Sequence, residues 1–152
     1  MKSTSFLAAG IAALAVSGLA LGATGVANAG TLPTTGNTIA MTVANDTDQP
    51  IYLQGADNPY GSWIAAPPQS VAPHSSRIIT AANNDPRGLG VDATYSLPDG
   101  SGTVVFMAND YSNSTDIDGT RTTGPRAGQY SVSSWIDTNY PNMNVGYHLS
   151  AV

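Results

Sequence analysis

From residue 38 to the C-terminus, apolar and polar residues alternate in short runs separated by Gly, Pro, Asn and Asp. The run from Leu89 to Leu97 is the cleanest, with an apolar or aromatic residue at every second position. Side chains of a β-strand point alternately to opposite faces, so this pattern predicts strands with one buried and one solvated face. No segment after residue 29 shows an apolar stripe at the 3.6-residue spacing of a helix. The sequence therefore predicts an all-β protein.

The alternating runs number about eight and are separated by turn residues at short intervals. They cover residues 39–43, 51–53, 71–73, 77–81, 89–97, 103–108, 130–136 and 143–151. The segment Pro98-Asp99-Gly100-Ser101 predicts a tight hairpin, because proline presets one backbone angle and glycine accepts a positive φ. We expect long loops at residues 55–68 and 109–128. This layout favours an antiparallel β-sandwich of about eight short strands, with a partly closed β-barrel as the alternative.

The first 29 residues differ from the rest of the chain. Lys2 precedes an almost unbroken apolar run from residue 6 to residue 26, and Ala27-Asn28-Ala29 supplies the small residues that a signal peptidase needs. We expect residues 1–29 to be a cleaved secretory signal peptide, residues 30–37 a flexible leader and residues 38–152 a single β-sandwich domain. An uncleaved anchor helix is the alternative. Cleavage leaves no segment apolar enough to span a bilayer, so we expect a secreted protein, with the cell envelope as a further location.

After residue 29 the chain contains no lysine, no glutamate and no cysteine. Its charged residues are four arginines and ten aspartates, which leave six negative charges in excess. Negative charge repels phosphate backbones, so nucleic acid is excluded as a partner and electrostatic docking to an anionic membrane is disfavoured. The absence of cysteine excludes disulfides and a thiol nucleophile, and a domain of this size can build a core without such links.

The sequence offers little support for catalysis. His74 follows a proline in a predicted turn, and His148 lies on the polar face of the last predicted strand, so we expect both to face solvent. A serine nucleophile needs a base such as histidine, and no Gly-x-Ser-x-Gly elbow is present. All ten acidic residues are aspartates, most of them in predicted turns. We therefore expect no enzymatic activity, with a small secreted hydrolase that uses His148 or His74 as an alternative.

One segment resembles part of a calcium-binding loop. Asp116-Ile117-Asp118-Gly119 is similar to the middle of an EF-hand loop, but an EF-hand ends in a glutamate, which this chain lacks. A shallow calcium site formed by Asp110, Asp116 and Asp118 stays open, against a plain solvated loop. No CxxC or HExxH motif supports zinc. We assign no metal site and expect no cofactor.

Aromatic residues in the predicted loops give the better indication of a binding surface. Tyr60 and Trp63 lie in the first long loop, Tyr111 opens the second, and Tyr140 lies in the turn before the last strand. Aromatic side chains on loops provide large, rigid contacts that suit sugar rings, lipid headgroups or another protein. Trp63 has a second interpretation, in which it folds back to plug the end of the sandwich. We expect Trp135, on a strand, to pack in the core or on a sheet face.

Several short motifs follow one another in an order that resembles a known family. They are an Asn-x-Thr strand end, a Gly-x-Trp segment, a double proline, a Val-x-Pro turn, a glycine-rich strand entry and a Val-Val-Phe strand. In this sequence they are Asn45-Asp46-Thr47, Gly61-Ser62-Trp63, Pro67-Pro68, Val71-Ala72-Pro73, Gly88 and Gly90 before Tyr95, and Val104-Val105-Phe106. Over residues 38–110 this layout is similar to the small secreted aegerolysin-type β-sandwiches of fungi and bacteria. The resemblance implies a non-catalytic fold that recognises membrane lipids.

Taken together, these features predict an exported, non-enzymatic β-sandwich that binds a surface ligand through aromatic loops. The predicted ligand-binding residues are Tyr60 and Trp63, with Tyr111 and Tyr140 as further candidates. Lipid, glycan and protein ligands at the cell surface all stay open. A structural or self-assembling cell-envelope protein is an alternative, because edge strands can pair between molecules. The small secreted hydrolase is the other alternative.

Overall fold

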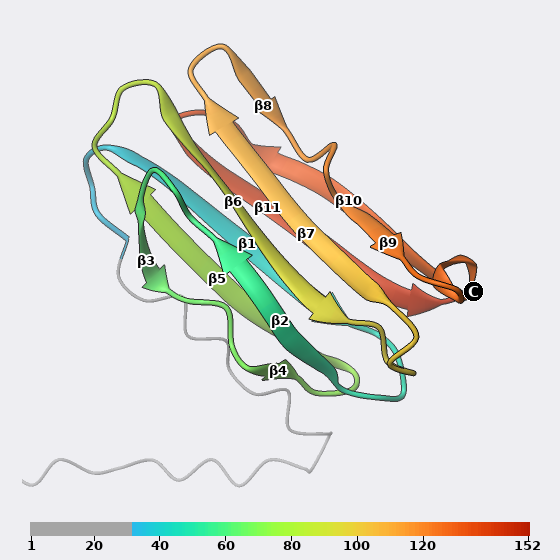
Figure 1. The fold of residues 1–152 in the computed structure, drawn as a ribbon. Helices are drawn as coiled ribbons and strands as arrows, with labels where there is room; N and C mark the ends of the chain where they lie inside the picture. The colour runs from blue at the N-terminus through green and yellow to red at the C-terminus, as the bar shows by residue number, and fades with distance from the viewer. Residues whose placement is uncertain (1–31) are drawn as a thin grey trace, which may run out of the picture.

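The structure, a computed structural model, describes residues 32–152, so the predicted signal peptide at residues 1–29 lies outside the described residues. Eleven strands and one short 3-10 helix, η1 (Ala127–Gln129), build two β-sheets that face each other (Figure 1). The predicted all-β sandwich is confirmed, and the sheets stay separate rather than closing into a barrel. None of the helices in the described part of the chain has the length and apolarity needed to cross a membrane.

The first sheet has the strand order β10-β11-β1-β5-β3. Its members, in that order, are Tyr130–Thr138, Asn142–Ala151, Asn37–Asn45, Ser75–Asn83 and Ser62–Ala65. β1 pairs antiparallel with β5 but parallel with β11, the last strand of the chain. This is the one parallel pair among the described strands, and the other pairs are antiparallel, as the sequence predicted. The first and last strands lie side by side inside the sheet, with β10 and β5 on either side of them.

The second sheet has the strand order β4-β2-β6-β7-β8, and β9 also pairs with β7. Its members are β4 (Ser70–Val71), β2 (Ile51–Asp57), β6 (Gly88–Ser96), β7 (Thr103–Tyr111), β8 (Ser114–Asp116) and β9 (Arg121–Thr123). β6 and β7 pair along their full lengths, from Gly88 opposite Tyr111 to Ser96 opposite Thr103. The predicted hairpin at residues 98–101 joins them, and Gly100 takes a φ of 69°, which glycine adopts without strain.

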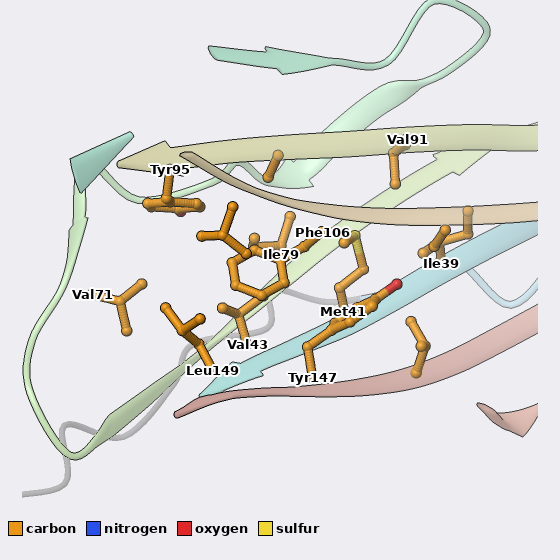
Figure 2. Close-up of a cluster of buried hydrophobic side chains, with 14 of the residues drawn as sticks. Ile39, Met41, Val43, Val71, Ile79, Val91, Tyr95, Phe106, Tyr147 and Leu149 are labelled. Carbon is orange, nitrogen blue, oxygen red and sulfur yellow. The ribbon is translucent and has the colours of Figure 1, made fainter. Parts of the chain in front are cut away.

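Inward-facing side chains of both sheets fill the space between them (Figure 2). Phe106 of β7 lies between two tyrosines, with ring centroids 6.1 Å from Tyr95 and 5.4 Å from Tyr147. Tyr147 belongs to the opposite sheet, so these rings join the two layers. The Tyr95 hydroxyl donates a hydrogen bond to the Pro68 carbonyl at 3.0 Å, and the Tyr147 hydroxyl donates to the Met107 carbonyl. Both buried hydroxyls are thus satisfied, and burial raises the pKa of each tyrosine.

The prediction of two long loops was partly wrong. β3 lies inside residues 55–68, and β8 and β9 lie inside residues 109–128. These three strands have only three or four residues each, and most of those residues are not buried. Each is held by backbone hydrogen bonds to its neighbouring strand rather than by an apolar face. Alternation of apolar residues could not reveal them, because that pattern records burial and not pairing.

Candidate functional site

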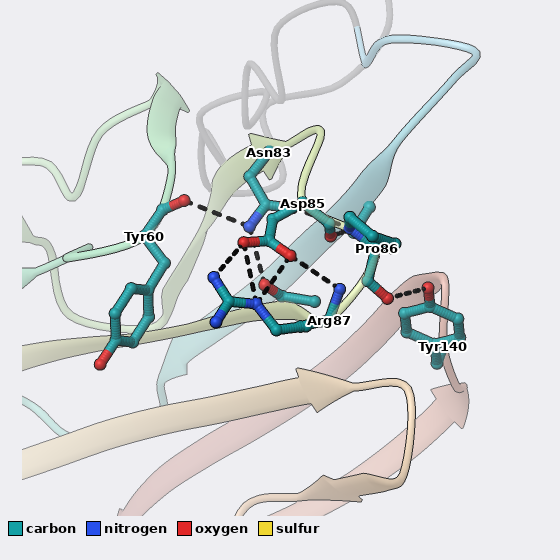
Figure 3. A network of polar contacts seen from close by, with 8 residues as sticks. Tyr60, Asn83, Asp85, Pro86, Arg87 and Tyr140 are labelled. Carbon is teal, nitrogen blue, oxygen red and sulfur yellow. Dashed lines mark hydrogen bonds and ion pairs between the residues drawn. The ribbon is translucent and has the colours of Figure 1, made fainter.

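Three tyrosines singled out in the sequence gather around the connection between β5 and β6, at one end of the sandwich. Tyr60 and Tyr111 line a hollow of about 300 Å³ together with three residues of that connection and its exit, Asp85, Arg87 and Gly88. We call these five residues the tyrosine hollow. Tyr140 lies on the far side of the same connection, where its hydroxyl donates a 2.8 Å hydrogen bond to the Pro86 carbonyl (Figure 3).

The charged part of the tyrosine hollow is a close ion pair. Arg87 Nη2 lies 2.5 Å from Asp85 Oδ2, and Arg87 Nε donates to both carboxylate oxygens at 3.0 and 3.1 Å. These hydrogen bonds hold the pKa of Asp85 down to about 2. The Arg87 side chain is nevertheless 84% exposed. The tyrosine hollow therefore presents a guanidinium and a carboxylate side by side to solvent at neutral pH.

Two asparagines fix the shape of the β5–β6 connection. The buried Asn37, at the start of β1, donates through Nδ2 to Asn83 Oδ1 at 2.9 Å and to the Asp85 carbonyl. Asn83 Nδ2 donates in turn to the carbonyls of Gly88 at 2.7 Å and Tyr60 at 3.2 Å. Backbone groups of a loop need partners when they leave the sheet, and here side-chain amides supply them. The same network ties the loop that carries Tyr60 to the loop that carries Asp85.

Gly88, at the end of this connection, cannot be replaced by a residue with a side chain without a steric clash. Gly88 has a φ of 102°, and a Cβ at this position would collide with the backbone of Asp110 and Tyr111. The close approach of β6 to β7 at this point depends on glycine. It sets the position of Tyr111, the residue opposite Gly88 in the ladder.

The two tyrosines of the hollow differ in exposure. Tyr60 is 63% exposed, whereas Tyr111 is partly buried at the end of β7. Burial raises the pKa of the Tyr111 hydroxyl, and the neighbouring Tyr60 and Asp116 raise it further. Tyr111 therefore stays protonated and can donate a hydrogen bond at neutral pH, while Tyr60 offers an exposed ring.

Trp63 does not line the tyrosine hollow. It lies on β3 opposite Ala81 of β5, is partly buried and packs against the core. Its assignment to a loop was wrong, and the structure agrees with the interpretation in which its ring folds onto the sandwich. Of the predicted ligand-binding residues, Tyr60 and Tyr111 both line the hollow. Tyr140 contacts the same connection from its other side, and Trp63 lies apart from the hollow.

The ion pair of the tyrosine hollow was not predicted from the sequence. Asp85 and Arg87 lie in a segment recognised only as a loop between two strands. The one available signal was the spacing Asp-Pro-Arg, which brings a carboxylate to the backbone amide and side chain of the arginine two residues later.

The three aspartates considered for calcium do not converge. Asp110 is buried at the end of the core, where its Oδ1 accepts a hydrogen bond from Thr115 at 3.2 Å and burial raises its pKa. Asp116 instead accepts from Asn109 Nδ2 at 3.1 Å. Within residues 32–152, no three His, Cys, Asp or Glu side chains lie close enough to hold a metal ion.

Both histidines pair with aspartates. His74 Nε2 lies 2.9 Å from Asp48 Oδ1 in an exposed turn, and His148 Nδ1 lies 2.6 Å from Asp46 Oδ2 on the outer face of the first sheet. A catalytic base must reach its nucleophile at roughly 2.6–3.2 Å. Among residues 32–152, neither histidine is hydrogen-bonded to a serine, and the nearby Ser75 hydroxyl donates to the Ala72 carbonyl at 2.7 Å.

No family model matches the sequence, and no curated protein matches it significantly. Among solved structures, the crystal structure of the lipid binding protein Nakanori has a similar fold. The TM-score is 0.64 at 13% sequence identity, over 76% of this chain and 72% of that chain. At this identity the likeness shows the fold alone, and the resemblance to aegerolysin-type sandwiches stands at the level of the fold.

Proposed function

We propose that this protein is an exported, non-enzymatic binding protein whose tyrosine hollow docks on the headgroups of a lipid surface. The observation that carries the proposal is the convergence of Tyr60 and Tyr111 with the exposed Arg87 and its partly buried partner Asp85 at one end of the sandwich. The fold it shares with a lipid binding protein supports lipid over glycan and protein for this end.

The chemistry of the tyrosine hollow suits a zwitterionic headgroup. Arg87 supplies a planar donor group for a phosphate, and Asp85 supplies a negative charge for an amine. The exposed ring of Tyr60 can attract a quaternary ammonium through its face. The excess of aspartates over arginines repels an anionic surface, whereas a zwitterionic surface carries no net charge to oppose binding.

A vesicle-binding experiment with matched tyrosine variants tests the proposal. We expect wild-type protein to sediment with phosphatidylcholine or sphingomyelin vesicles and to ignore phosphatidylglycerol vesicles. Tyr60→Ala and Arg87→Ala should each reduce binding about tenfold, since one lost contact of 1.4 kcal/mol changes affinity by that factor. Tyr52→Ala is the control, because Tyr52 is 54% exposed but lies at the opposite end of β2 from this hollow. Failure of wild-type protein to bind any zwitterionic vesicle, or equal losses for Tyr52→Ala and Tyr60→Ala, contradicts the proposal.

The edge strand β10 favours self-assembly as a second candidate function. It is nine residues long, forms one edge of the first sheet and carries a single charged residue, Asp137. Long edges with few charges can pair with a second molecule. Size-exclusion chromatography over a wide concentration range decides this: a strict monomer at the highest concentration removes self-assembly, and growth of oligomers that Ser133→Lys suppresses supports it.

A further inference from the structure

A second aromatic cluster lies on the outer face of the first sheet, away from the tyrosine hollow. β1 starts at Asn37, which anchors that hollow, and ends at Asn45, a length of nine residues. At about 3.3 Å per residue this strand is about 30 Å long. Asp46, directly beyond β1, pairs with His148 of the neighbouring β11, so the cluster lies toward the far end of the sandwich.

Trp135 is the aromatic member of this cluster. It lies on the outer face of β10, opposite Gly146 of β11, and is 42% exposed. A Cβ at residue 146 would collide with the indole ring, so the ring rests on the bare backbone of β11. The imidazole of His148 lies beside it, with ring centroids 5.2 Å apart and planes 47° apart. The indole and imidazole rings thus form an aromatic surface on the outer face of the sheet, outside the core.

His148 is held in a fixed orientation. Its Nδ1 lies 2.6 Å from Asp46 Oδ2, which leaves Nε2 free to hydrogen-bond a ligand. His148, Ala44 and Ser76 lie next to one another on adjacent strands. A shallow hollow of about 260 Å³ opens over this row. We call Trp135, His148 and Asp46, with this hollow, the tryptophan face.

The charges of the tryptophan face limit its ligand. No arginine lines the hollow, and the described residues contain no lysine. A phosphate or carboxylate would meet Asp46 with no fixed cation to offset the repulsion. The other polar groups of the hollow are hydroxyls, the Asp46 carboxylate and the imidazoles of His74 and His148, each of which is paired with an aspartate. With the half-exposed indole of Trp135 they offer hydrogen-bond donors and acceptors around a flat apolar surface. A sugar ring has the matching surfaces, with C–H groups on its faces and hydroxyls around its rim.

We propose that the tryptophan face binds a neutral saccharide. One sugar ring stacks on Trp135, its hydroxyls donate to the Asp46 carboxylate and to His148 Nε2, and a neighbouring sugar unit extends over Ser76. Ala44 lies between His148 and Ser76, so β1 places no large side chain between these two residues. This site is separate from the proposed lipid site, and a molecule that carries both can link a lipid surface to a polysaccharide.

Affinity electrophoresis of the full protein tests the saccharide site. The gels contain galactomannan, xyloglucan or hydroxyethylcellulose as neutral polymers, or polygalacturonate as an anionic polymer. We expect at least one neutral polymer, and not polygalacturonate, to retard the wild-type protein. Trp135→Ala should weaken that retardation about tenfold or more, and His148→Ala should weaken it by a smaller factor. Trp63→Phe is the control, because it changes the other tryptophan while keeping an aromatic ring in its packed position.

Gly146→Ala keeps both Trp135 and His148 but moves the indole off the strand, so it should lose retardation while the protein stays folded. Circular dichroism of each variant establishes that the fold persists. Tyr60→Ala should bind the neutral polymer like wild type, which separates this site from the lipid site. The proposal is overturned if none of the neutral polymers retards the protein, if Trp135→Ala binds like wild type, or if polygalacturonate binds equally well.

Discussion

The tyrosine hollow and the tryptophan face are assembled in different ways. Most groups of the hollow come from connections, and they depend on hydrogen bonds that Asn37 and Asn83 make to backbone carbonyls. The tryptophan face is formed mainly by residues of adjacent strands, whose places are set by the pairing register. A site built on connections therefore needs buried polar anchors and special backbone angles, whereas a site built on strands needs mainly the sheet itself. The two regions should respond differently to mutation.

The largest expected difference concerns glycine. Gly88→Ala places a Cβ against the Asp110 backbone at a φ of 102°, and should lower the free energy of unfolding by about 3 kcal/mol or more. Gly100→Ala is the matched control, because Gly100 also has a positive φ but has open space around it and should lose only about 1 kcal/mol. Urea denaturation measures both values. Equal losses would mean that the end of the sandwich has room to adjust.

A smaller loss of stability is expected when the side-chain amide of Asn37 is removed. Asn37→Ala leaves Asn83 Oδ1 and the Asp85 carbonyl without their donor, and should cost about 2 kcal/mol. Ser76→Ala on the tryptophan face removes no hydrogen bond recorded for residues 32–152, and should change stability by less than about 0.5 kcal/mol. Thermal and urea unfolding of the two variants compare the regions directly. If Ser76→Ala is as destabilising as Asn37→Ala, the contrast drawn between the sites is wrong.

Gly146→Ala should change the spectrum more than the stability. The added methyl must displace the Trp135 ring, but the ring lies on an open face and can move into solvent, so we expect a cost of less than about 1 kcal/mol. Tryptophan fluorescence should shift to longer wavelength as the ring becomes hydrated. An unshifted emission maximum would show that the indole does not rest on residue 146.

The smallest expected effect concerns the order in which Asp92 and Asp85 are protonated. The hydrogen bonds from Arg87 lower the pKa of Asp85 to about 2, whereas burial and then the charge of Asp57 raise the pKa of Asp92 above its usual value. As pH falls, Asp92 should be protonated first, and Asp85 should stay charged until about pH 2. The stability contributed by Asp85 is therefore complete above its ordinary pKa of 3.8 and lost as pH falls through about 2. NMR titration of the carboxyl carbons measures the order, and Arg87→Ala should return Asp85 toward 3.8.

The sequence was sufficient for the fold class because the long strands bury one face. β6 and β7 alternate along nearly their whole length, so their strands and the hairpin between them were predictable. The short strands β3, β8 and β9 bury no continuous face, and alternation missed them. The parallel pairing of β1 with β11 was also missed, because alternation predicts which side of a strand is buried and not which strand is its neighbour.

The same limit applies to the two sites. Tyr60, Tyr111 and Tyr140 were recognisable as aromatic residues near loops, but the partnership of Asp85 with Arg87 required the local turn to be known. Trp135 and His148 lie on the two strands of the β10–β11 hairpin, whereas Asp46 comes from a distant part of the chain and reaches them only because β1 pairs with β11. The contact of Asp46 with His148 depends on which strands are neighbours and on their register, and the amino-acid composition reveals neither.

The position of β11 has a consequence for how the molecule is made. Its residues lie far from β1 in the sequence, yet they fill an interior place in the first sheet, between β1 and β10. No tight turn can join two parallel strands, so β1 and β11 can pair only when the long segment between them closes into a loop. Closure across about a hundred residues is slow compared with local hairpin formation. Pairing of β1 with β11 should therefore be a late step in the folding of the first sheet.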